Sequence, residues 1–235
     1  MTPTPAFQRK ASTMLAFAVY LIGISAVIFE KTVVDDLRKH GSKDYCYGFP
    51  TSRCRYFNLT PLHLMRNPTT LLMMAGAFAV VASITSLCNI VLVPRLVTGR
   101  RRPDDQKEYL VQRLRLLSVV TSLASTIFAL AASIYAHLAQ NSSSKWRYTD
   151  EDSSEQQFTI ESWVCQMSTT MKYYTFWNQT CTAARSARWF MFPLLFCLVP
   201  LGLLGFLEWR RQIPRARVEM DEKDEKEHME YEMPA

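Results

Sequence analysis

Cysteines and asparagine-linked glycosylation sequons occupy the same two segments of this 235-residue chain. The sequons have the form Asn-x-Ser/Thr, and their acceptor residues are Asn58, Asn141 and Asn178. The same two segments contain four of the six cysteines, namely Cys46, Cys54, Cys165 and Cys181. Disulfides persist, and N-linked glycans are added, only on the non-cytosolic side of a membrane. Two independent chemical markers therefore predict that both segments face away from the cytosol.

The spacing of these cysteines predicts disulfides rather than a metal site. Seven residues separate the first pair and fifteen separate the second, whereas zinc sites use much closer pairs. Local pairing within each segment is the simplest arrangement, but the connectivity stays open. The remaining cysteines, Cys88 and Cys197, fall in apolar stretches and are expected to be small packing residues.

Signatures of enzymes are missing from the sequence. It contains no H-E-x-x-H, G-x-S-x-G or P-loop motif. The histidines are scattered along the chain, at His40, His63, His137 and His228. We therefore predict no catalytic residues, no metal site and no cofactor, and we identify no small-molecule substrate.

Four apolar stretches separate the remaining segments, each near the roughly 20 residues that cross a bilayer. None contains Asp, Glu, Lys or Arg, which argues against an ion pump or a proton-coupled transporter. They predict an all-α membrane protein, a four-helix transmembrane bundle with a small disulfide-tied extracellular cap of β-strands and loops. The predicted segments are a cytosolic tail 1–10, spans 11–29, 70–93, 116–138 and 189–207, extracellular loops 30–69 and 139–188, a basic cytosolic loop 94–115, and an acidic cytosolic tail 208–235.

Local signals refine these boundaries. The charged residues 30–40 are expected to extend the first helix beyond the membrane. Pro94 is expected to end the second span, and Pro193 and Pro200 to interrupt the fourth. Residues 158–167 alternate loosely in hydropathy, which predicts a strand in the larger loop.

Charge distribution supports an orientation with both termini in the cytosol. The formal net charge is +6, but basic residues cluster beside the apolar spans, so we assign them to the cytosolic face rather than to nucleic acid binding. A cleaved signal peptide is the competing interpretation of 11–29, although its apolar region would normally be about 7–15 residues. The secretory route implied by the sequons predicts a multi-pass protein of the plasma membrane.

Small residues recur at helical spacing in the second and third spans. The second contains Ala75, Ala79, Ser83 and Ser86, and the third contains Ser118, Ser122, Ser125, Ala129, Ser133 and Ala136. Small residues let helix backbones approach closely in lipid. We expect these two spans to pack face to face, and the alternative is a surface for a partner's helix.

The first outer loop carries a resemblance to a known family. Aromatic residues around Gly48 predict a short hairpin between Cys46 and Cys54. Together with four spans and cytosolic ends, this layout resembles the claudin-like four-span superfamily, which includes fungal plasma-membrane proteins of the eisosome and PalI type. The family's Gly-Leu-Trp motif is absent here, and the second cysteine pair is additional. The resemblance implies an outer sheet on a four-helix bundle and a role in membrane organisation or signalling.

These observations predict a non-enzymatic membrane organiser, scaffold or accessory subunit. We expect the spans to contact the lipid bilayer. We expect the aromatic outer loop, with Trp163 and Trp177, to bind a membrane-protein partner or a second copy of the chain. A channel-forming subunit is the alternative, because cysteine pairs in both outer loops resemble gap-junction-type proteins in layout. A membrane-embedded enzyme or carrier has no acid, base or metal site to support it.

Overall fold

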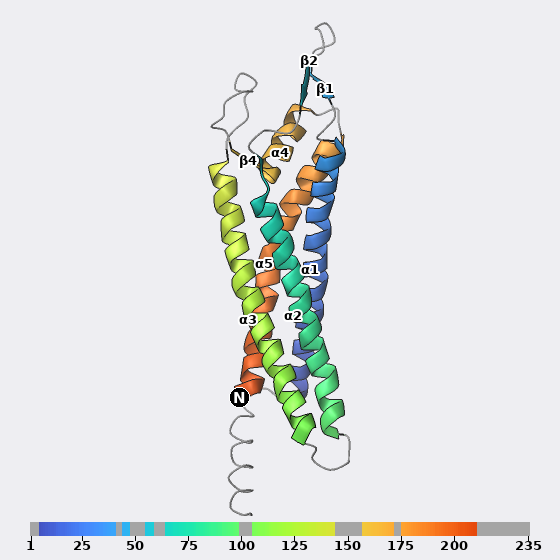
Figure 1. Cartoon of the computed structure of the whole chain (residues 1–235), viewed down its shortest axis with the longest axis vertical. Helices are drawn as coiled ribbons and strands as arrows, with labels where there is room; N and C mark the ends of the chain where they lie inside the picture. Colours follow the sequence, from blue (N-terminus) through green and yellow to red (C-terminus); the bar gives the residue numbers. More distant parts are fainter. Residues whose placement is uncertain are drawn as a thin grey trace, which may run out of the picture.

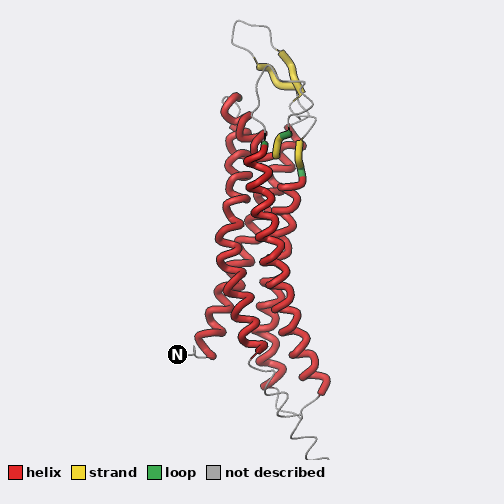
Figure 2. Tube along the Cα trace, turned by 90° about the vertical axis from the view of Figure 1, so that its left-hand side faces the viewer, coloured by secondary structure: helices red, strands yellow, loops and turns green. Residues whose placement is uncertain are grey.

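Four long helices form the body of the molecule. The computed structural model describes residues 5–40, 44–47, 55–58, 64–98, 105–143, 157–171 and 175–210. The long helices are α1 (Pro5–His40), α2 (Asn67–Thr98), α3 (Asp105–Ser142) and α5 (Thr175–Arg210), and they run side by side (Figures 1 and 2). Each is long and apolar enough to cross a membrane. The predicted four-helix membrane bundle is confirmed, with helices that extend beyond the predicted spans.

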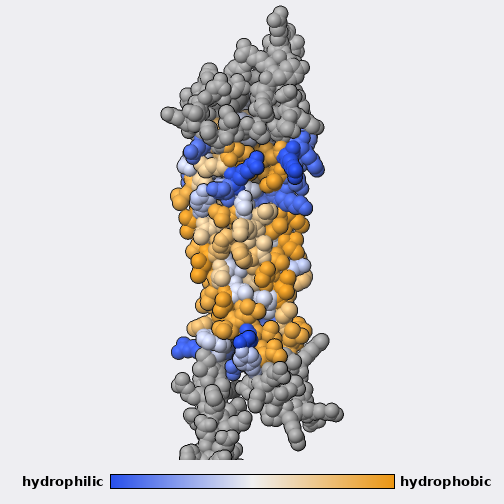
Figure 3. All heavy atoms as spheres, viewed as in Figure 1, coloured by the Kyte–Doolittle hydropathy of each residue, from blue (hydrophilic) through white to orange (hydrophobic). Residues whose placement is uncertain are grey.

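An apolar belt surrounds the bundle. Figure 3 shows hydrophobic side chains covering its middle, with hydrophilic ones gathered toward the ends. Large apolar side chains point outward from this belt, among them Phe17, Leu21, Ile127, Leu130 and Phe196. A water-soluble monomer rarely exposes so large an apolar patch, whereas lipid tails solvate it.

Helices α1 and α2 come into close contact through one glycine from each. A Cβ atom added at Gly23 would lie 2.9 Å from the carbonyl oxygen of Gly76, and one added at Gly76 would lie 2.9 Å from that of Gly23. Each glycine begins the same pattern, Gly-x-x-Ala-Val, which recurs in the two antiparallel helices. The absence of side chains at this crossing lets the backbones touch.

Helix α2 continues through Pro94 to Thr98, so the prediction that this proline stops the second helix is wrong. Proline removes the N–H that would bond the carbonyl four residues earlier, which is that of Ile90. The Nη2 atom of Arg9 donates to this carbonyl oxygen at 3.0 Å. A side chain from α1 thus supplies the donor that the proline withholds.

Helix α5 is also continuous, and Pro193 and Pro200 lie inside it. The predicted interruption is therefore wrong. Pro193 is exposed and Pro200 is half-buried, while Leu194, Leu198 and Leu201 on the opposite side are buried. Packing of that buried face holds the helix together, and transmembrane helices tolerate proline where neighbouring groups compensate.

Short strands lie at one end of the bundle (Figure 2), where Figure 1 also places α4 (Ile160–Thr170). Strands β1 (Asp44–Tyr47) and β2 (Arg55–Asn58) pair antiparallel, with Cys46 opposite Tyr56, which confirms the predicted hairpin. Strands β3 (Leu64–Met65) and β4 (Phe158–Thr159) pair in parallel and connect the two outer loops.

The predicted strand over 158–167 is wrong beyond its first two residues, because α4 (Ile160–Thr170) follows directly. Thr159 caps this helix, and its hydroxyl oxygen accepts from the backbone N–H of Ser162 at 3.1 Å. The buried residues have helical spacing, with members at Ile160, Trp163, Val164 and Met167. The cap therefore contains a helix besides strands and loops.

Candidate functional site

The cap at the strand-bearing end of the bundle is built on an apolar core between α4 and the adjacent ends of α1 and α5. Val33 and Leu37 of α1 pack there with residues of α4 and α5. Its buried members from this end of the molecule include Phe158, Trp163, Val164, Met167 and Trp177. This core joins elements far apart in sequence and fixes α4 on the bundle.

A disulfide joins Cys165 of α4 to Cys181 of α5. It links residues 16 positions apart, so the second cysteine pair is local. Cys54 of the first pair lies outside the described residues. Cys88 and Cys197 are free and half-buried in the bundle.

Trp163 and Trp177 are core residues, so the prediction that they contact a partner is wrong. They are only 4% and 1% exposed. Phe158 packs edge-on against Trp163, with ring centroids 5.2 Å apart. Aromatic side chains are large enough to fill the gap between α4 and the bundle, and burial there gives more apolar contact than an outward position.

An ionic cluster lies beneath the cap, at the junction of three helices. Glu161 of α4 forms a salt bridge with Arg188 of α5, with Oε1 and Nη2 2.9 Å apart. Glu30 of α1 is only 2% exposed and lies near enough to Glu161 for their charges to repel.

The carboxyl group of Glu161 is poorly solvated. Burial raises the pKa of Glu161 above its ordinary value, while the nearby Arg188 and Arg185 lower it by less. Desolvation thus outweighs the ion pair. His137 of α3 lies close to Arg188. Three of the long helices, α1, α3 and α5, therefore contribute to this region.

The apolar pattern of the sequence places Glu30 just outside the first span and indicates no role for it. Its burial follows from a regular stripe along α1, in which buried positions recur at intervals of three and four residues: Ala16, Val19, Gly23, Ala26, Glu30, Val33 and Leu37. Following the same spacing of three and four residues beyond residue 29 predicts that Glu30 is buried. No comparable signal in the sequence brings Glu161 and Arg188 together.

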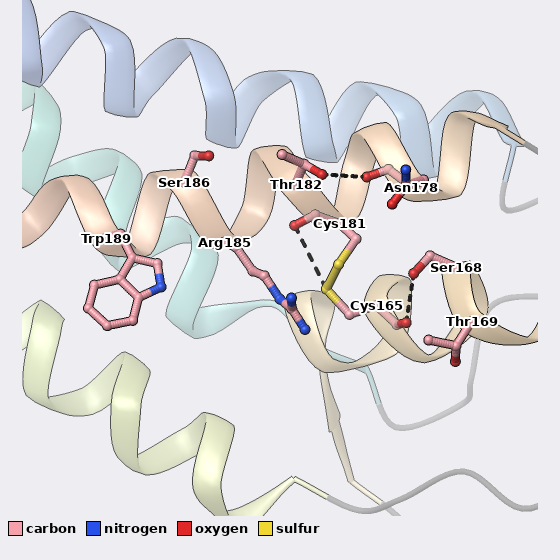
Figure 4. Close-up of a pocket in the computed structure, with 9 residues that line it drawn as sticks. All are labelled: Cys165, Ser168, Thr169, Asn178, Cys181, Thr182, Arg185, Ser186 and Trp189. Atoms are coloured by element: carbon pink, nitrogen blue, oxygen red, sulfur yellow. Dashed lines mark hydrogen bonds between the residues drawn. A yellow bond between two sulfur atoms is a disulfide. The ribbon is translucent and has the colours of Figure 1, made fainter.

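A cleft with several polar lining residues opens between α4 and α5 beside the disulfide (Figure 4). It has a volume of about 480 Å³, within the range of small-ligand sites. Its lining includes Ser168, Thr169, Asn178, Thr182 and Arg185. Trp189 lies at one end and Asn178 at the other, and the guanidinium group of Arg185 extends toward α4.

The three sequon asparagines lie in different elements. Asn58 ends β2, Asn141 is exposed near the end of α3, and Asn178 is exposed in α5. Thr180, which completes the last sequon, is buried, with Oγ1 3.0 Å from Oδ2 of Asp36. Of the three, only Asn178 lines the cleft.

Hydroxyl groups bind α2 to α3 within the bundle. Ser86 and Ser118 lie 3.1 Å apart, oxygen to oxygen, and Thr85 and Thr121 lie 2.9 Å apart. Ser125 donates to the carbonyl oxygen of Phe78 across the same contact, at 3.0 Å. The predicted packing of the second span on the third is confirmed.

Similarity to known proteins and possible metal ligands both bear on the role of the cap and the bundle. Comparisons with protein-family models, curated proteins and solved structures found no match. Among the described residues, no group of three or more His, Cys, Asp or Glu side chains could hold a metal ion.

Proposed function

We propose that this chain is a non-enzymatic organiser, scaffold or accessory subunit of the plasma membrane. Both termini lie in the cytosol, and the cap faces the extracellular side. The cap and the lipid-facing bundle surface bind a membrane-protein partner or a second copy of the chain. The layout is that of a claudin-like four-span protein.

One observation carries this proposal: α4 is fastened to α5 by a disulfide and by a shared apolar core. Binding through a surface that is already ordered loses less conformational entropy than binding through a flexible loop. A cap fixed in this way suits recognition of another molecule.

The orientation draws on chemistry at the same end of the bundle. The Cys165–Cys181 disulfide and the Asn178 sequon belong to the cap, and disulfides form in oxidising compartments. The acceptor Asn58 belongs to the β1–β2 hairpin at this end. Each marker favours an extracellular cap.

The alternative, a channel subunit, would draw its polar lining from the hydroxyl groups of the second and third spans. Those of Ser86, Ser118, Thr85 and Thr121 bond one another across the α2–α3 contact. For one copy to form a pore along this contact, these pairs would have to separate. Their pairing favours the organiser over the channel.

Site-specific photo-crosslinking in intact cells tests the proposal. Cap positions Lys39 and Gln157 and bundle positions Leu21 and Ile127 are all exposed. We expect a reproducible adduct of one defined mass, with another protein or with a second copy, from the cap and from at least one bundle position. Absence of a protein adduct at all four positions would contradict the organiser role. Ionic current through bilayers containing only the purified protein would favour the channel.

A further inference from the structure

The cleft between α4 and α5 presents mainly hydrogen-bond acceptors. The hydroxyl groups of Ser168, Thr169 and Thr182 each donate to a backbone carbonyl of their own helix, at 2.8, 2.7 and 2.8 Å. A hydroxyl group whose proton is engaged still offers oxygen lone pairs. Arg185 adds a strong donor to the lining. The hydrogen-bonding capacity of the lining is therefore mainly acceptors, with donors from Arg185, the Ser186 hydroxyl group and the Trp189 indole.

This pattern selects a class of ligand. An anion needs donors around it rather than acceptors, and here the protons of three lining hydroxyl groups are engaged, so these groups present oxygen lone pairs. A carbohydrate carries hydroxyl groups that donate to Ser168, Thr169 and Thr182 and ring or hydroxyl oxygens that accept from Arg185. The cleft therefore matches a sugar better than a phosphate or a carboxylate.

A source of sugar is attached to the cleft itself. Asn178 is exposed, lines the cleft and begins the sequon completed by Thr180. Arg185 follows seven residues later, about 10 Å along the helix axis. A glycan on Asn178 would start inside the cleft and meet Arg185 within its first sugars.

Covalent attachment makes weak contacts sufficient. An open cleft with one charged residue would hold a free sugar poorly. A tethered ligand, however, experiences an effective concentration on the order of millimolar. The cleft therefore needs only modest affinity to be occupied by its own glycan.

The burial of Thr180 determines when the sugar arrives. Its side chain is 1% exposed, and its Oγ1 lies 3.0 Å from Asp36 of α1. The transferase must reach this threonine, so transfer precedes the docking of α5 on α1.

In the transfer, the Asn178 amide nitrogen bonds the anomeric carbon of a lipid-linked oligosaccharide diphosphate. The bond from that carbon to the diphosphate breaks, and the amide proton leaves with the diphosphate.

We propose that an N-linked glycan on Asn178 folds into the α4–α5 cleft and becomes part of the cap. This inference rests on the extracellular orientation proposed above. It assigns Ser168, Thr169, Thr182 and Arg185 as the protein's contacts with the sugar.

The test follows enzymatic release of each glycan from the full chain, produced in cells that add N-glycans. We expect Asn178 to be occupied and its glycan to leave the native protein roughly tenfold more slowly than the denatured protein, because release requires the cleft to open. Arg185→Gln should reduce this protection. Arg38→Gln, at an exposed position on α1, should leave it unchanged.

Three results would overturn the inference. Occupied Asn58 with empty Asn178 would reject the glycan in the cleft while leaving the orientation intact. Occupied Asn178 released equally fast from native and denatured protein would reject the packing in the cleft. If all three sequons are empty, the orientation fails and the inference fails with it.

Discussion

Single residues in this protein act through the groups that surround them. Glu161 illustrates the balance, because its carboxylate is paired with Arg188 and yet burial dominates its titration. Arg9 compensates for a proline, since its guanidinium group donates the hydrogen bond that the Ile90 carbonyl oxygen cannot receive from Pro94. The titration of Glu161 and the hydrogen bond of Arg9 can both be tested by substitution.

The raised pKa of Glu161 predicts a pH dependence of stability. Below 4.5, its ordinary pKa, Glu161 is protonated in both states and its contribution to folding is fully present. As the pH rises toward its folded pKa, the unfolded chain releases the proton first, so the free energy of unfolding falls. Thermal unfolding across this pH range should therefore show a decline that Glu161→Gln reduces.

Other ionisable groups face Glu161, and they define the controls. Glu30 of α1 repels its charge, while Arg185 and Arg188 of α5 attract it. Glu208→Gln, at an exposed position at the opposite end of α5, should leave the decline unchanged. An unaltered slope in Glu161→Gln would contradict the prediction.

The Arg9 hydrogen bond predicts a coupling between two positions. Arg9→Ala should lower stability by about 1 kcal/mol, because the Ile90 carbonyl loses its donor. Pro94→Ala restores a backbone N–H within reach of that carbonyl. The cost of Arg9→Ala should therefore shrink in the Pro94→Ala background, as measured by a double-mutant cycle of unfolding in detergent. Additive effects would show that the two positions are independent.

At the scale of elements, the helices approach closely where their side chains are small or absent. The α1–α2 crossing brings two backbones together at Gly23 and Gly76, and the α2–α3 contact uses small hydroxyl residues. Helices in lipid gain little from burying apolar surface, so close packing and hydrogen bonds stabilise the bundle.

Gly76→Ala tests the crossing. Its Cβ would lie 2.9 Å from the carbonyl oxygen of Gly23, so the helices must separate, at a cost of about 1–3 kcal/mol. Gly205→Ala is the matched control, because its Cβ would meet only Val119, at 3.5 Å. Thermal stability in detergent should fall for the first variant and stay near the wild-type value for the second. Equal effects would argue against a backbone contact.

On the scale of the whole molecule, the disulfide and the cap core connect the outer loop to the membrane bundle. Cys165 and Cys181 join α4 to α5, while Val33 and Leu37 bring α1 into the same core. The cap is thus part of the folded unit rather than an appendage.

Replacing both Cys165 and Cys181 with Ser tests the importance of this link. A loop of this length predicts a loss of about 3 kcal/mol, so protease cleavage in the cap and intracellular retention should increase. Cys88→Ser, at a free cysteine in the bundle, should leave both unchanged. Normal surface delivery of the double variant, measured by surface labelling, would contradict a structural role for the disulfide.

The sequence alone determined the four helices, the hairpin and the packing of the second span on the third. Span length, exclusion of charge and small-residue spacing are properties of contiguous segments, so they can be read along the chain. Only the tertiary structure decided that Trp163 and Trp177 are buried, that Glu30 meets Glu161, and that Arg9 compensates for Pro94. Each of these depends on particular side chains brought together from distant parts of the chain, and no local pattern shows which of those side chains will meet.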